Sequence, residues 1–224
     1  MTDLQGKDVE FFGKITASMT HEFKNVLAII KESAGLMEDI TQIAPLSDSR
    51  HQEKLDNALK TIKNQLNRGM ELSTVFNRFA HTPDKSLAEI NLHHLAGQVV
   101  TLSERFARLK HITLTVAPEG ESDTSLAVTG SPVWLQMAVY LAIECGLKIL
   151  PAESAITLTS EIHDGKKSIR LDFAPGQADA ADAGELAGTV DELPAWAELS
   201  QLMQTVDGAA GWLDPAPGIR LTFE

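Results

Sequence analysis

The sequence lacks the features that mark several large classes of protein. A single cysteine, Cys145, among 224 residues excludes an internal disulfide framework and a cysteine-rich zinc site. No apolar run approaches the roughly 20 residues that cross a bilayer, and the charged N-terminal stretch MTDLQGKDVE has no apolar signal-peptide core. The chain is therefore expected to be cytoplasmic and to make no contact with membranes.

Positive charge and aromatic side chains are also scarce. The formal net charge at pH 7 is −12, and aromatic residues make up 5% of the chain. An acidic protein repels nucleic-acid phosphates and anionic lipids, and few rings remain for stacking on bases. With 43% hydrophobic and 22% charged residues, the composition is that of an ordinary globular protein. Nucleic acid is excluded as an expected partner, which leaves other proteins or small molecules.

The excess of acidic residues and most prolines fall in the second part of the chain. Eight of the nine prolines lie in residues 82–224, the first of them within the turn-like run His81-Thr-Pro-Asp84, and so does nearly all of the net negative charge. A change of composition at a turn is typical of a domain boundary. Two domains are therefore predicted, residues 1–82 and residues 88–224.

The first domain is predicted to be a helical hairpin. Apolar residues recur every three or four positions from Phe12 to Met37 and again from Leu55 to Phe79, on either side of the helix-breaking Pro45. Two helices of about 35 and 30 residues would each be about 50 Å long. Their wide apolar faces need a further partner, so we expect a homodimer in which two hairpins form a four-helix bundle.

The second domain alternates helices and strands. The hydrophobic patterns predict helices over 92–109, 133–150 and about 195–206, and strands over 112–116, 155–162, 168–173, 211–213 and 219–223. A turn is expected at 163–165 and a loop in the acidic stretch 177–192. Three tryptophans, at 134, 196 and 212, are expected in the core. The predicted fold class is α+β: a helical hairpin plus an α/β sandwich with helices on one sheet face.

A short run on the first helix contains the candidate chemistry. At about 100° per residue, His21 lies about 200° from the apolar Met19, so its imidazole is expected to face solvent. A neutral imidazole can accept a phosphoryl group: one nitrogen attacks while the other shares its proton with a carboxylate, for which Glu22 is the nearest candidate. Ala17 and Ala28 on the same strip leave room for a docking protein. The alternative interpretation is an ordinary surface histidine on a long helix.

The run Thr20-His-Glu-Phe-Lys-Asn-Val-Leu27 resembles the H-box of bacterial sensor histidine kinases. In that family the histidine is phosphorylated on a helical hairpin that dimerises, and Val26 stands where the family usually has proline. The resemblance implies that His21 accepts a phosphoryl group. It also implies that Lys24 helps to hold the transferring group and that Asn25 orients a water molecule.

The second domain resembles the histidine kinase (GHKL) ATPase domain, but its nucleotide ligands are changed. The family carries Asn-Leu-x-x-Asn-Ala on one helix, and the second asparagine holds Mg²⁺; this chain has Leu141 and Cys145 at the two asparagine positions. A thiol is a poor ligand for a hard, oxygen-seeking ion. The stretch Asp172-Phe-Ala-Pro-Gly176 keeps only part of the Asp-x-Gly-x-Gly adenine box, which leaves Asp172 as the weak candidate for residual nucleotide contact.

The glycine-rich loop that should cradle phosphates is missing. An acidic segment stands in its place, and it would repel a nucleoside triphosphate because a phosphate cradle needs free backbone N–H groups and positive charge. Its carboxylates belong to Asp179, Asp182, Glu185, Asp191 and Glu192.

An intact acceptor histidine beside a degenerate ATP-binding domain resembles the dimeric histidine phosphotransferases of phosphorelays. That resemblance implies a phosphoprotein that relays a phosphoryl group between His21 and receiver-domain aspartates in two-component signalling. It also implies no ATP-dependent autokinase activity, and no metal or cofactor bound by this chain. The receiver domain of the partner response regulator would supply Mg²⁺. Two alternatives stay open: a divergent sensor histidine kinase, and a non-catalytic pseudokinase adaptor that binds response regulators.

Overall fold

The computed structural model describes residues 6–43, 49–119, 126–176 and 183–223, which form two compact units. One unit comprises Thr16–Phe79, and the other combines the chain up to Ile15 with Ala80–Glu224. The second unit therefore includes the start of a helix that the sequence analysis assigned to the domain at residues 1–82. Pro45, the expected helix breaker, lies outside the described residues.

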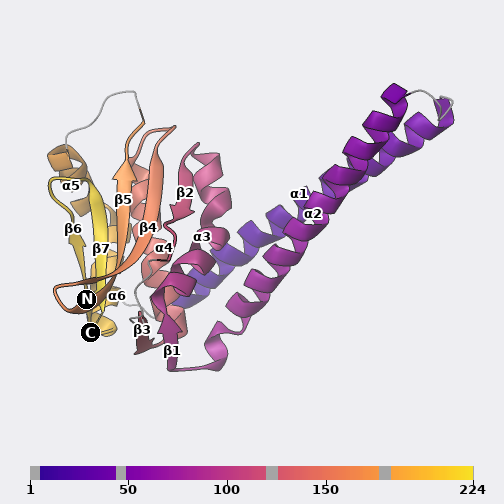
Figure 1. Ribbon diagram of the computed structural model, residues 1–224. Coiled ribbons are helices and arrows are strands. Elements are labelled where there is room, and N and C mark those ends of the chain that lie inside the picture. The colour runs from indigo at the N-terminus through magenta and orange to yellow at the C-terminus, as the bar shows by residue number, and fades with distance from the viewer. Residues whose placement is uncertain (1–5, 44–48, 120–125, 177–182, 224) are drawn as a thin grey trace. The chain divides into compact units, whose positions relative to one another are not determined.

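The hairpin unit consists of most of α1 (Lys7–Ile43) together with α2 (Ser49–Ala80), as the two apolar stripes predict (Figure 1). Phe23 and Phe76 join the helices edge to face, with ring centroids 6.4 Å apart. Gly69 allows a close approach, since a Cβ atom at that position would lie 3.4 Å from Cγ1 of Val26. The two helices thus pack directly on one another in the turns that follow His21.

Only part of the apolar surface of the hairpin is buried within one chain. On α2, Ala58 and Leu72 are buried, whereas Leu59, Leu66 and Met70 are exposed, Met70 by 69%. A helix that packs against a single neighbour buries one stripe, and the apolar side chains beside that stripe remain in water. The apolar face predicted on α2 therefore lies partly uncovered.

The α/β unit is built on a five-stranded sheet with the order β2-β4-β5-β7-β6. Strand β2 is parallel to β4, and the other pairs are antiparallel. A separate antiparallel pair, β1 with β3, was not predicted from the sequence. The strands are β1 (Ala88–Asn91), β2 (Thr113–Val116), β3 (Ala127–Gly130), β4 (Ala155–His163), β5 (Lys166–Ala174), β6 (Gly208–Trp212) and β7 (Gly218–Phe223).

Three helices, α3 (Leu92–Leu109), α4 (Pro132–Ile149) and α6 (Pro194–Thr205), cover one face of this sheet (Figure 1). Helix α4 lies close to the strands, because a Cβ atom on Gly146 would come within 2.8 Å of Ile156 and 2.9 Å of Phe173. The glycine after Cys145 therefore sets the distance between helix and sheet. This arrangement confirms the predicted fold class of a hairpin plus an α/β sandwich.

Local sequence signals account for where several elements begin and turn. The Asn91 side chain accepts a hydrogen bond from the backbone N–H of His94 and caps α3. Helices α4 and α6 begin with proline, which fits the first helical turn because its missing N–H has no partner there. Asp164 and Gly165 both have positive φ, as the two-residue turn between β4 and β5 requires.

The prediction of a loop over 177–192 is wrong for its second half. Residues Ala183–Asp191 form helix α5, while residues 177–182 lie outside the described part of the chain. Leu186 and Val190, one helical turn apart, are both buried, and this burial stabilises a helix whose acidic composition suggested a loop. The three tryptophans are half-buried rather than enclosed in the core.

By length and composition alone, α4 would qualify as a membrane-spanning helix. However, 72% of its apolar window is buried inside the structure. Its high hydropathy is that of a helix enclosed between the sheet and neighbouring helices.

The first turns of α1 belong to the α/β unit because their side chains contact α4 and α6. Phe11 is only 3% exposed, and its ring centroid lies 5.1 Å from that of Tyr140 on α4. Lys7 pairs with Glu198 of α6 at an N–O distance of 3.0 Å, and Ile15 is fully buried. Apolar burial, with an ion pair at its edge, thus fixes this segment to α4 and α6.

Replacing Phe11 with alanine tests this anchoring. Removal of a buried ring leaves a cavity, so F11A should lower the free energy of unfolding by about 3–5 kcal/mol. Urea titration followed by tryptophan fluorescence measures it, because all three tryptophans lie in the α/β unit. The control V9A alters a side chain on the same helix that is 71% exposed and should change stability by about 0.5 kcal/mol or less. Equal effects of the two variants would contradict the anchoring.

Candidate functional site

His21 lies on α1 within the hairpin unit and is exposed, as its spacing from Met19 predicts. Among the described residues, its imidazole has no hydrogen-bond or ion-pair partner. Lys24 and Asn25, one turn further along, are also exposed. The structure therefore leaves the ring accessible to a docking protein, with a cation and an amide beside it.

Glu22, unlike the adjacent His21, is buried. It is only 4% exposed, and its Oε2 accepts a hydrogen bond from Nη2 of Arg68 on α2 at 2.9 Å. Its other oxygen, Oε1, lies 3.4 Å from Nδ2 of Asn25. The carboxylate proposed from sequence as a base for His21 is thus held between the helices by these two partners, and its role as a base stays a prediction.

Arg68 was not singled out from the sequence. It follows Glu22 by 46 residues, on the other helix of the hairpin. The available signal is the predicted turn near Pro45: folding the chain antiparallel there brings residues near 68 opposite residues near 22. That signal places Arg68 only roughly, because helix rotation decides which side chains meet.

In the α/β unit, the two positions that carry asparagines in the kinase pattern hold buried apolar groups. Leu141 and Cys145 are both buried on α4. Burial, followed by the negative charge of Glu144, raises the pKa of the Cys145 thiol to about 12. A thiol that stays protonated is a weak ligand for any ion.

A cavity of about 210 Å³ lies beside Leu141, between α4, α6 and the start of α1. The charged side chains that line it form three ion pairs. The N–O distance is 3.0 Å between Lys7 and Glu198, and 3.1 Å in both the Lys14–Glu10 and the Lys148–Glu144 pair. Hydrogen bonding to Glu198 raises the pKa of Lys7, and Lys14 lowers the pKa of Glu10. Because each ammonium has a carboxylate partner, the cavity has no net positive charge to attract phosphates.

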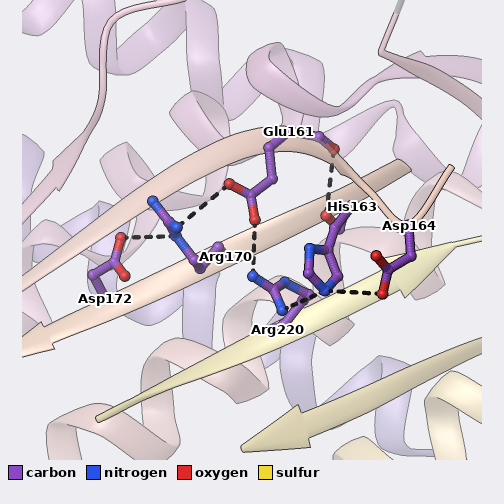
Figure 2. A network of polar contacts seen from close by, with 7 residues as sticks. Glu161, His163, Asp164, Arg170, Asp172 and Arg220 are labelled. Atoms are coloured by element: carbon purple, nitrogen blue, oxygen red, sulfur yellow. Dashed lines mark hydrogen bonds and ion pairs between the residues drawn. The ribbon is translucent and has the colours of Figure 1, made fainter. Parts of the chain in front are cut away.

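Asp172 lies on the opposite face of the sheet from α4. Phe173 points toward the helix at Gly146, and successive side chains of a strand point to opposite faces. Asp172 accordingly joins a polar network on the other face, where its carboxylate accepts a hydrogen bond from Nε of Arg170 at 3.1 Å (Figure 2). The structure therefore does not bring Asp172 together with Leu141 and Cys145.

The same network extends over three strands. Glu161 on β4 contacts Arg170 and also accepts a hydrogen bond from Arg220 of β7 at 3.1 Å, while a second nitrogen of Arg220 lies 3.0 Å from Nε2 of His163 (Figure 2). These paired charges stabilise the polar face of the sheet. Asp172 belongs to this layer.

Two further sequence predictions concern the acidic segment and metals. Asp191 and Glu192 are exposed at the end of α5, whereas Asp179, Asp182 and the Glu185 side chain lie outside the described residues. Within the described ranges, no three His, Cys, Asp or Glu side chains come together as a candidate metal site.

No family model and no curated protein matches the chain. Solved structures of histidine kinases are similar to it. Histidine kinase AdeS of Acinetobacter baumannii is 13% identical, with a TM-score of 0.42, over 90% of this chain and 95% of that one. The catalytic domain of histidine kinase ThkA is 14% identical, with a TM-score of 0.47, over 62% of this chain and 94% of that one. Histidine kinase ThkA in complex with the response regulator TrrA gives 16% identity and a TM-score of 0.44, over 97% of this chain and 63% of that one.

Thiol labelling tests the environment of Cys145. With a pKa of about 12 and a buried sulfur, the thiol should react with iodoacetamide at pH 8 far more slowly than an unfolded thiol, by about 100-fold or more. Mass spectrometry follows the labelling, and the same protein in concentrated urea gives the unfolded rate. Rapid labelling of the native protein would contradict a buried, protonated thiol.

Proposed function

We propose that the chain is a homodimeric histidine phosphotransferase that relays a phosphoryl group between His21 and aspartates of receiver domains. The observation that carries this proposal is that two adjacent residues of α1 face opposite environments. His21 is exposed, whereas Glu22 is buried and forms an ion pair with Arg68 of α2. The second support is negative: buried Leu141 and Cys145 stand at the two asparagine positions of the resembling kinase pattern, and Cys145 stands at the one that holds Mg²⁺ there. Under this proposal, the phosphoryl group comes from another phosphoprotein rather than from ATP.

The transfer is a displacement at phosphorus. The unprotonated nitrogen of the His21 imidazole attacks the phosphorus of an aspartyl phosphate; an N–P bond forms while the P–O bond to the aspartate breaks, and the aspartate leaves as a carboxylate. The ring carries positive charge until its second nitrogen loses a proton, and Glu22 is the carboxylate proposed from the sequence to share that proton. Lys24 balances the charge of the transferring group, and the receiver domain supplies Mg²⁺. Asn25 can orient a water molecule for hydrolysis of the phosphohistidine. With partners of this kind, the proposal also assigns the protein to the cytoplasm.

Phosphotransfer from labelled receiver domains tests the role of His21. A panel of receivers from the source organism is loaded with acetyl phosphate and mixed with wild type, H21A and H94A, the last altering an exposed histidine of the α/β unit. Wild type and H94A should acquire acid-labile label, and H21A should acquire none, because it lacks the nucleophile.

Three results would overturn the proposal. Equal labelling of H21A and wild type would exclude His21. Autophosphorylation of the wild type with Mg-ATP would establish a divergent kinase. Binding of receivers without any transfer would establish a non-catalytic adaptor.

The uncovered apolar face of the hairpin supports the proposed homodimer. Leu59, Leu66 and Met70 on α2 and Leu27 and Leu36 on α1 are all exposed in the single chain. Such a run of apolar side chains on paired helices is covered when a second hairpin completes a four-helix bundle. The occupant proposed is therefore a second copy of the chain.

A charge placed in this face tests the dimer. L66E should weaken self-association at least tenfold, because the glutamate would be buried without a partner in the bundle. The control L109E alters a leucine of the α/β unit that is 63% exposed and should leave association unchanged. Sedimentation equilibrium measures the mass; a wild type that sediments as one chain at all concentrations would contradict the dimer.

A further inference from the structure

The cavity between α4, α6 and the start of α1 is lined by groups that the proposed phosphotransfer does not use. Its volume of about 210 Å³ is that of about seven water molecules at about 30 Å³ each. Phe11, Met137 and Leu141 form apolar walls, and Tyr140, which is only 6% exposed, also lines it. The cavity therefore has room for a small organic molecule.

The Tyr140 hydroxyl has no hydrogen-bond partner among the described residues. Burial, followed by the negative charges of Glu144, Glu10 and Glu198, raises the pKa of this phenol. The hydroxyl is therefore protonated near neutral pH, and the carboxylates that line the cavity are close enough to act on it. A buried hydroxyl without a partner costs free energy, and a polar group bound in the cavity would offset that cost.

Two of these carboxylates are largely buried and have acceptor capacity left. Glu144 follows Tyr140 by one turn of α4, so the two side chains lie on the same face of the helix. The Glu144 side chain is 20% exposed, and its ammonium partner among the described residues is Lys148, at 3.1 Å. Glu198 of α6 is 16% exposed and pairs with Lys7 at 3.0 Å. An ionised carboxylate has about four lone-pair sites, so a single ammonium does not satisfy either group.

The chemistry of these groups determines which class of ligand fits. The lining charges balance, and the charged groups that act on the buried phenol are carboxylates, so the phosphates of a nucleotide would have no positive charge to compensate them. A metal ion does not fit either, because within the described ranges no three carboxylates, imidazoles or thiols come together as a candidate metal site. A protonated amine supplies three N–H donors, and the rings of Phe11 and Tyr140, with centroids 5.1 Å apart, suit an apolar body.

We propose that this cavity is a binding site for a small primary amine with an apolar body. The ammonium group donates hydrogen bonds to the Glu144 carboxylate and to the Tyr140 oxygen, while the apolar part packs against Phe11 and Leu141. Lys148, whose side chain is 40% exposed, turns toward water. Because the start of α1 supplies one wall of the cavity, the bound amine also stabilises the packing of this segment on α4 and α6.

Benzylamine is the probe that tests the site, and the ¹³C-methyl signal of Met137 reports on the cavity, because this buried methionine lines it. The signal is assigned by its absence from M137L. Benzylamine should shift it with a dissociation constant on the order of 1 mM or below. Benzyl alcohol and benzoate have the same ring but no ammonium group, and they should bind at least about tenfold more weakly.

Two variants test the polar contacts. Y140F removes the hydroxyl but breaks no hydrogen bond among the described residues, so it should weaken benzylamine binding about threefold or more without lowering the free energy of unfolding. E144Q keeps the shape of the side chain and removes its charge, and it should weaken binding about tenfold or more. The control E89Q alters an exposed glutamate of β1 in the same unit and should bind benzylamine as the wild type does.

The outcomes decide between an amine site and other uses of the cavity. Benzylamine that binds no more tightly than benzyl alcohol would identify a merely apolar cavity and overturn the proposal. Tighter binding of benzoate or of ATP would identify an anion site and overturn it, and so would the lack of a saturable shift up to about 20 mM benzylamine. Unchanged binding in folded Y140F and E144Q would exclude the assigned contacts. The comparison of probes on the wild type decides the question even where a variant fails to fold.

The test is independent of the proposed phosphotransfer. The cavity belongs to the α/β unit, whereas His21 belongs to the hairpin unit. Failure of amine binding therefore leaves the phosphotransfer proposal intact, and failure of phosphotransfer leaves the amine site intact.

Discussion

A carboxylate buried between two helices requires a positive partner, and in this protein that requirement links the fold of the hairpin to the presentation of His21. Glu22 faces the helix interface, where Arg68 compensates its charge, whereas the preceding residue, His21, faces solvent. Adjacent positions on a helix point about 100° apart. One rotation of α1 therefore both buries the carboxylate and exposes the imidazole, so the two features cannot be varied independently.

Apolar packing, rather than a buried ion pair, determines the arrangement of α4 in the α/β unit. Helix α4 lies close to the sheet at Gly146, and its other side is covered by α6 and the start of α1. The charges around the remaining cavity are paired, and burial keeps the Cys145 thiol protonated. The cavity beside Leu141 is therefore small, and its lining charges balance. Such a unit stabilises the start of α1 through Phe11 and Tyr140.

Much of the architecture followed from local patterns. The 3.6-residue period of apolar side chains predicted the long helices, and Asp164-Gly165 predicted the hairpin between β4 and β5. The acidic composition of residues 177–192 predicted a loop, but part of this stretch forms α5. Two apolar residues one turn apart are buried there and stabilise the helix. Burial of Leu186 and Val190 depends on neighbours far along the chain, so no local pattern could report it.

At the candidate site, the sequence by itself determined which residue faces water: the angle between His21 and the apolar stripe is a property of the helix alone. It also determined that Leu141 and Cys145 lie one helical turn apart on α4. Only the tertiary structure decided that Arg68 meets Glu22 and that Asp172 lies on the sheet face opposite α4. Both depend on how separate elements are rotated and paired, and a side chain's partner across an interface is set by packing over the whole unit rather than by its neighbours in sequence.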